Sequence, residues 1–310
     1  MYSTAHPRDY PACSGCSLCR LVCPMWRSRR DPRFSPEGLA KARQNGAAVA
    51  ELAPALDACA LCGACDPVCP ENIDLSGMVM NLRRDLPAHP ELVALQASYQ
   101  QTAEAAEAAP AGALLLPGSA LRADAGLLAR VLELLGIRCA TDDGADIALA
   151  LEAGGAVDPA RRRRFLDMLG GRTLVVGDGL LLRELRHWLP GARLQGLGEA
   201  LGNIPALRRR IAGADFYVIE ARAYHADHQR LVAHYDALRK ESGCAMNLDL
   251  QRIAIPACDE AEARWMLKGR SPARIVVEDA AAREVFRCVV EVPVLHPTEL
   301  AALNEEIHHA

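Results

Sequence analysis

One cysteine pattern, written twice near the start of the chain, restricts what this sequence can fold into more than any other feature. Each copy reads Cys-x-x-Cys-x-x-Cys-x-x-x-Cys-Pro, and the two copies occupy residues 13–24 and 59–70. Three thiolates at three-residue intervals can wrap three corners of an iron–sulfur cube, while a fourth ligand must approach from another direction. The sequence therefore predicts two [4Fe–4S] clusters.

In the bacterial two-cluster pattern, the fourth cysteine of each copy binds the cluster held by the other copy. We therefore expect two crossed sets of ligands. The first set is Cys13, Cys16, Cys19 and Cys69, and the second is Cys59, Cys62, Cys65 and Cys23. Zinc and disulfide bonds are the alternatives. Zinc sites favour paired Cys-x-x-Cys knuckles separated by longer loops, and disulfide frameworks belong to small secreted chains.

Length and composition bound the remaining possibilities. The 310 residues are 51% hydrophobic and carry a net charge of -4, so bulk charge favours neither nucleic acid nor an anionic membrane as a partner. Residues 1–10 contain no apolar signal segment, and no apolar run is long enough to span a membrane. We expect a cytoplasmic protein, with any peripheral membrane association made through a partner.

Residues 1–90 are expected to form a helical domain around the cysteines. Ser35, Pro36 and Glu37 mark a helix start, and a second helix is predicted over 49–56, with a kink or restart at Pro54. A third is predicted over 75–86.

These features resemble the α-helical ferredoxin domain. That domain occurs in an iron–sulfur subunit of heterodisulfide reductase, in those of anaerobic glycerol-3-phosphate dehydrogenase and glycolate oxidase, and, with one motif altered, in succinate dehydrogenase. The resemblance covers roughly residues 10–90, where all eight cysteines match and the last helix ends in Leu82-Arg83-Arg84. It implies an electron-transfer subunit of an oxidoreductase complex.

The pattern changes after a predicted linker helix at 91–110. From residue 111 to residue 310, short apolar runs alternate with helical periodicity, which predicts a parallel α/β architecture. The expected strands are 114–116, 146–151, 173–176, one near 194, 215–220, 250–255, 274–278 and 289–292. The expected helices are 124–135, 159–169, 180–189, one from 198, 225–240, 259–267, 280–287 and one from 297.

The α/β region reads as a tandem repeat, with halves at about 111–203 and 213–304. This layout is similar to the tandem CCG domains, named for a Cys-Cys-Gly motif, that follow the ferredoxin module in the heterodisulfide reductase and glycolate oxidase families. Ser119 stands where those families have cysteine after Pro-Gly, and residues 141–144 read Thr-Asp-Asp-Gly where Cys-Cys-Gly is expected. The repeat is thus degenerate, and the noncubane cluster and disulfide chemistry of intact CCG motifs do not carry over.

Outside the two motifs the candidates are weaker. Four isolated cysteines are expected to be buried structural thiols: Cys139, Cys244, Cys258 and Cys288. His225, His228 and His234 are interpreted as the wet face of a helix, with a metal site or a flavin or quinone contact as the alternative. The basic run 161–164 is interpreted as a solvated face. Seven basic residues between 20 and 43 form a positive rim suited to an acidic redox partner.

We therefore expect an electron-transfer subunit that relays single electrons through two [4Fe–4S] clusters. Its donor would be a protein partner, such as a flavoprotein dehydrogenase, and its acceptor a ferredoxin or quinone-linked carrier. The first alternative is an iron–sulfur oxidoreductase whose α/β region itself binds a substrate or flavin. The second is a degenerate α/β region that serves only as a docking scaffold. No catalytic residue is assigned.

Overall fold

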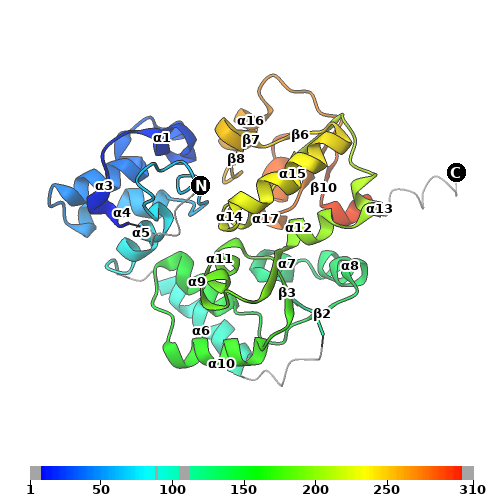
Figure 1. The fold of residues 1–310 in the computed structure, drawn as a ribbon, viewed down its shortest axis with the longest axis horizontal. Coiled ribbons are helices and arrows are strands. Elements are labelled where there is room, and N and C mark those ends of the chain that lie inside the picture. Colours follow the sequence, from blue (N-terminus) through cyan, green and yellow to red (C-terminus); the bar gives the residue numbers. More distant parts are fainter. Residues whose placement is uncertain (1–7, 88–89, 105–111, 302–310) are drawn as a thin grey trace, which may run out of the picture.

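The structure is a computed structural model that describes residues 8–87, 90–104 and 112–301 (Figure 1). A helical N-terminal domain lies beside two α/β halves, each built on a four-stranded parallel sheet. The predicted fold class, a helical domain followed by parallel α/β structure, is confirmed at this level.

Short helices carry the cysteine-bearing domain. They are η1 (Tyr10–Ala12), α1 (Leu18–Val22), α2 (Pro24–Arg29), η2 (Pro32–Phe34), α3 (Pro36–Gln44), α4 (Val49–Ala58) and α5 (Leu75–Arg83). The predicted start at Ser35 is confirmed, because its hydroxyl accepts a hydrogen bond from the amide of Gly38 at 3.0 Å. Helix α4 continues through Pro54, so the predicted restart there is wrong.

Helix α6 (Pro90–Glu104) covers the described part of the predicted linker, and residues 105–110 lie outside the described ranges. It packs against α9 (Ala145–Ala153) of the first α/β half. The N-terminal domain packs there as well, since Leu56 and Met78 share one apolar cluster with Leu114 and Phe165. Apolar packing therefore joins the cysteine-bearing domain to the α/β region.

The first half orders its strands β2 (Arg138–Cys139), β1 (Leu114–Leu116), β3 (Thr173–Val176) and β4 (Arg193–Gly196). Its remaining helices are α7 (Gly118–Ala123), α8 (Ala125–Leu135), α10 (Pro159–Leu169), α11 (Gly179–Trp188) and α12 (Leu197–Gly202). Every pairing within the sheet is parallel. Parallel strands need crossover connections, which the intervening helices supply.

The second half repeats this order. Its sheet runs β10 (Val294–Leu295), β9 (Arg274–Val277), β5 (Asp215–Val218) and β6 (Ala245–Met246), again all parallel. The helices are α13 (Pro205–Arg208), α14 (Ala221–Ala226), α15 (His228–Ser242), α16 (Glu260–Leu267), α17 (Ala280–Arg287) and η4 (Pro297–Leu300). The shared order, in which the first strand of each half lies between the second and the third, agrees with an internal repeat.

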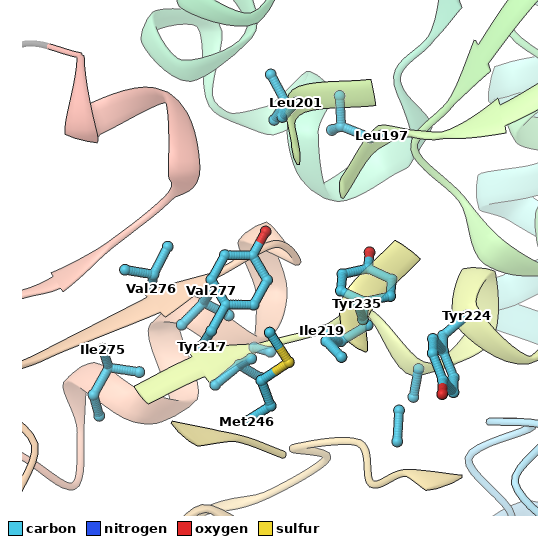
Figure 2. Packing of buried hydrophobic residues seen from close by; sticks show 14 of the residues in the cluster. Leu197, Leu201, Tyr217, Ile219, Tyr224, Tyr235, Met246, Ile275, Val276 and Val277 are labelled. Carbon is cyan, nitrogen blue, oxygen red and sulfur yellow. The ribbon is translucent and has the colours of Figure 1, made fainter. Parts of the chain in front are cut away.

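The core of the second half is formed by aromatic rings and β-branched side chains. Tyr217 on β5 and Tyr235 on α15 lie side by side with ring centroids 6.5 Å apart, and Tyr224 on α14 is 5.6 Å from Tyr235 (Figure 2). Val276 and Val277 extend this cluster on β9. Three tyrosines from β5, α14 and α15 thus pack together in the core of the second half.

Several predicted elements are wrong. Residues 146–151, predicted as a strand, lie in α9, because an alanine-rich run following Gly144 in the left-handed conformation favours a helix. Residues 250–255 form η3 (Leu250–Arg252) and β8 (Ile253–Ala254). Strand β8 pairs with β7 (Leu248–Asp249) in a small antiparallel ladder, and β6 takes the predicted place in the main sheet. Residues 289–292 are a turn, and the last strand follows at β10.

Two predicted helices also differ in detail. The helix expected over 225–240 is divided at Asp227 into α14 and α15. The element at Pro297 is the 3₁₀ helix η4, and residues after 301 lie outside the described ranges.

Candidate metal centre

The first cysteine loop bends sharply around Cys16. Gly15 has φ +81° and Ser17 has φ +65°, so the residues on both sides of Cys16 are left-handed. Lys41 on α3 donates to the carbonyl oxygen of Cys13 at 2.7 Å. Helix α1 then carries Cys19, while Cys23 lies where α1 ends and α2 begins.

The second loop repeats this backbone conformation. Leu61 has φ +51° and Gly63 has φ +73°, on either side of Cys62. Leucine rarely takes a positive φ, since its Cβ then crowds the following carbonyl oxygen. Turns of this kind can orient successive amide groups toward an anionic ligand. Because both loops adopt this unusual backbone conformation, we infer that binding by their cysteines requires it.

The eight thiols of the two motifs lie near one another in the folded domain. One small cavity is lined by Cys13, Cys16, Cys19 and Cys69. The other four cysteines, Cys23, Cys59, Cys62 and Cys65, lie close enough for their charges to raise one another's pKa values. Cys19 and Cys23 also lie close enough for their charges to interact. The crossed assignment of four ligands to each cluster stays a prediction.

The donor set fits iron–sulfur binding. Burial raises the pKa of Cys19 to about 12 and that of Cys23 to about 11, and it also raises the pKa of Cys65. Such thiols stay protonated without metal, so cluster binding must displace their protons. Within the described ranges no three His, Cys, Asp or Glu side chains converge on one point suitable for a single metal ion. A cube, which attaches its ligands at four separate corners, does not need that convergence.

The two sites differ in exposure. Cys16 is exposed at the first site, whereas Cys62 and Cys65 are buried at the second. The α/β region covers the second site through α14. His225 places Nδ1 2.7 Å from the carbonyl oxygen of Cys62, and Arg222 donates to the carbonyl oxygen of Ala60 from two nitrogens at 2.9 and 3.1 Å.

A second arginine holds the same loop from the other side. Arg83 on α5 donates to the carbonyl oxygens of Leu56 and Cys59, both at 2.6 Å. The positive charges of Arg83 and Arg222 both lower the pKa of Cys59, against the larger rise caused by burial. Two guanidinium groups thus stabilise negative charge at the second site.

The prediction for the histidines was wrong in part. His225 lies against the second cysteine loop, where burial lowers its pKa to about 3, so it is not on a wet face. His228 is half-buried and packs on Tyr224, with ring centroids 5.3 Å apart. No sequence signal pairs residue 225 with residue 62, because only the folded chain brings them together.

The remaining cysteines are a mixed group. Cys244 is buried and Cys139 is half-buried, as structural thiols would be, but Cys258 and Cys288 are exposed, so the prediction of burial fails for these two. Cys258 lies close enough to Cys62 for their charges to interact.

Arg161 also departs from its prediction. It is buried between Asp142 and Asp146, with ion pairs of 2.8 and 2.7 Å.

Comparison with known proteins agrees with this geometry over part of the chain. Residues 10–73 match the family model of a 4Fe-4S dicluster domain. No curated protein matches the chain, and no solved structure does. No helix within the described ranges has the length and apolar character to cross a membrane. The cysteine-bearing part of the chain is therefore an iron–sulfur, ferredoxin-like domain that supports electron transfer.

Proposed function

We propose that the chain is an electron-transfer subunit that relays single electrons through two [4Fe–4S] clusters. The proposal rests on one observation: two loops of matching backbone geometry gather eight cysteine thiols within one small domain. Cys13, Cys16, Cys19 and Cys69 would hold one cluster, and Cys23, Cys59, Cys62 and Cys65 the other. When bound, each cluster supplies a centre that accepts and donates one electron.

The chain itself gives the two sites different roles. Cys16 opens the first site to a protein partner, and the apolar Leu18 and Leu21 beside it are 43% and 48% exposed. Arg29 and Arg30 at the end of α2 are exposed, and neither forms an ion pair with a described residue. An apolar centre with a positive rim suits an acidic partner. We infer that electrons enter or leave at the first site.

The second site is covered in part by α14 and α5, which supply Arg222 and Arg83. Positive charge and hydrogen bonds near a cluster favour its reduced form. We infer that this site is the inner station of the relay. The donor would be a flavoprotein dehydrogenase and the second carrier a ferredoxin or a quinone-linked protein. A relationship to the heterodisulfide reductase and glycolate oxidase iron–sulfur subunits is part of the proposal.

An anaerobic reductive titration tests the relay. Protein purified without oxygen should take up about two electrons per chain and return them to an added oxidant with its absorbance restored. Reduction that destroys the chromophore, or no reversible uptake at all, would contradict the proposed function.

A further inference from the structure

Exposed apolar side chains gather where the N-terminal domain meets the second α/β half. Six large apolar side chains are exposed among the described residues, and four of them are Leu18, Leu21, Leu250 and Trp265, each between 43% and 49% exposed. Leu18 and Leu21 lie one turn apart on α1, Leu250 begins η3, and Trp265 lies on α16. Figure 1 shows α1 and α16 at neighbouring edges of the two parts. Single exposed apolar residues are ordinary, but a contiguous group marks an interaction site.

One arginine of α2 connects the members of this group. The guanidinium of Arg27 donates to the carbonyl oxygen of Leu21 at 2.9 Å and stacks on the ring of Trp265, 4.0 Å from its centroid. It also pairs with Asp249, the chain neighbour of Leu250, at 2.7 Å. Helix α16 packs against α2 as well. The four exposed apolar side chains therefore belong to one surface, which we call the seam surface.

The seam surface is hollowed beside Trp265. A cavity of about 280 Å³ lies there, with Phe216 and Met246 on its apolar wall. Lys268 and Arg270 line the same cavity, are exposed, and form no ion pair with a described residue. A protruding side chain of a folded partner can fill such a cavity, which a flat lipid surface cannot do.

The charge of this surface is positive. The carboxylates beside it are already engaged, because Asp249 pairs with Arg27 at 2.7 Å and Glu260 pairs with Arg264 at 2.9 Å. The two cations that line the cavity at the end of α16 are left without a counter-charge. An apolar centre with cationic residues at its edge complements an acidic protein.

The seam surface lies close to cysteines assigned to both clusters. Cys19, a proposed ligand of the first cluster, stands between Leu18 and Leu21 on α1. The amide of Arg27 donates to the carbonyl oxygen of Cys23, a proposed ligand of the second cluster, at 3.0 Å. Electron tunnelling weakens steeply with distance. A carrier docked on this surface would therefore be well placed to exchange electrons with the chain.

We propose that the seam surface docks an acidic electron-carrier protein, which contacts the N-terminal domain and the second α/β half at the same time. An apolar side chain of the carrier would enter the cavity beside Trp265, and its carboxylates would face Lys268 and Arg270. The α/β region would thus supply part of the partner's binding site. This inference rests on the proposed electron-transfer function and extends it to the place where a partner binds.

Binding of an acidic plant-type ferredoxin to the full, cluster-loaded chain tests the proposal. Both proteins are kept oxidised, so that calorimetric titration measures docking without electron flow. We expect saturable binding that weakens as salt is added. Cytochrome c, a basic carrier, and vesicles of phosphatidylcholine and phosphatidylserine should bind less tightly. No saturable binding of the ferredoxin, or tighter binding of cytochrome c or of the vesicles, would overturn the proposal.

Leu250→Ala tests the apolar centre of the seam surface. Val93→Ala is its matched control, because Val93 on α6 has the same exposed fraction of 49% and lies outside the seam surface. We expect Leu250→Ala to weaken ferredoxin binding roughly three- to tenfold and Val93→Ala to leave it unchanged. Equal affinities of the two variants would refute the docking surface.

Replacing both Lys268 and Arg270 by glutamine tests the charged edge. The pair Arg163→Gln and Arg193→Gln removes the same charge from exposed positions elsewhere. We expect the first pair to weaken ferredoxin binding roughly tenfold at low salt and the second pair to have little effect, so equal losses would refute the charge assignment. Iron content and melting temperature verify that each variant is loaded and folded. A chain that binds the ferredoxin but cannot be reversibly reduced would contradict the proposed function and still support this docking surface.

Discussion

The imidazole Nδ1 of His225 lies 2.7 Å from the carbonyl oxygen of Cys62, which joins α14 of the second α/β half to the second cysteine loop. The two residues are 163 positions apart in the chain. Their contact is so close that a Cβ atom on Gly63 would come within 2.9 Å of the Cβ of His225. The α/β region thus packs directly against the second cysteine loop.

This contact predicts a strong effect of Gly63→Ala. An L-residue at φ +73° costs roughly 1–2 kcal/mol, and the clash with His225 should add a further cost of about 1–3 kcal/mol. Gly46→Ala is the control, because Gly46 has φ +85° and no atom within 4 Å of an added Cβ. Melting temperature and iron retention should both fall more for Gly63→Ala. Equal losses of melting temperature and iron in Gly63→Ala and Gly46→Ala would show that α14 does not hold the second cysteine loop.

The buried Arg161 provides a test of the first α/β half. It bridges Asp142 and Asp146, so Arg161→Ala leaves two buried carboxylates without a counter-charge. We expect a loss of stability of about 3–5 kcal/mol, seen as a lower melting temperature. Arg163→Ala, on the exposed face of the same helix, should change stability by no more than about 0.5 kcal/mol. Equal melting temperatures of Arg161→Ala and Arg163→Ala would contradict this account of the buried ion pairs.

The pH dependence of stability follows from three buried groups, Glu220, Glu278 and His296, that line a cavity of about 430 Å³ between the two α/β halves. Burial, with repulsion from Asp279, raises the pKa of Glu220 to about 8, and burial raises that of Glu278 to about 7. The stability that each contributes is present below its unfolded pKa, near 4.5, and is lost as pH rises through the folded value. Burial lowers the pKa of His296 to about 3, so its contribution is lost as pH falls below about 6.5.

Between pH 6.5 and 8.5 only the carboxyl groups of this set titrate, so the melting temperature should fall over that interval. The loss should approach about 2 kcal/mol in free energy of unfolding. Glu220→Gln should flatten the slope, whatever its effect on absolute stability, while Glu284→Gln on the exposed face of α17 should leave the slope unchanged. A slope that Glu220→Gln leaves unchanged would refute this assignment.

The positive rim of the first site predicts a charge preference in electron exchange. Reduced protein should react faster with the anion ferricyanide than with a cationic cobalt complex, and added salt should reduce the difference. Replacing Arg29 and Arg30 by glutamine should slow the reaction with ferricyanide several-fold. The pair Arg163→Gln and Arg193→Gln removes the same charge elsewhere and should have little effect. Stopped-flow mixing measures both rates, and equal slowing would place the exchange surface elsewhere.

Local patterns in the sequence predicted much of the fold. The start of α3 at Ser35, and the elements β1, β3 and α10, follow from caps and apolar runs that lie within a few residues of each other. Residues 146–151 were predicted wrongly because a short apolar run has no period that separates a strand from a buried helix. The helix of this segment is decided by Gly144 and by packing against α6.

The candidate site was also predictable only in part from the sequence. Fixed spacing within two short motifs was enough to predict an iron–sulfur domain, which the family match over residues 10–73 supports. The contacts of Arg222 and His225 with the second loop were not predictable, since they join segments more than 160 residues apart. The residues that line the cavity between the two halves were not predicted, because they come from four separate strand ends. A tandem α/β layout indicates a pocket between the halves but does not give its charge.

Cys16, the exposed cysteine of the first loop, allows a single-residue test of the proposed cluster ligands. Cys16→Ser should lower iron to about four atoms per chain if the two sites load separately, because serine is a poor substitute for a thiolate ligand. Cys288→Ser, at an exposed cysteine outside both groups, should leave iron content unchanged. Loss of iron from both variants alike would contradict the assignment of ligands.

The most direct measurement is iron and sulfide content together with low-temperature electron paramagnetic resonance of anaerobically purified, reduced protein. Two crossed [4Fe–4S] clusters predict about eight iron and about eight sulfide per chain, with a signal broadened by two interacting spins. About four iron with a single unbroadened signal, or zinc in place of iron, would contradict the relay.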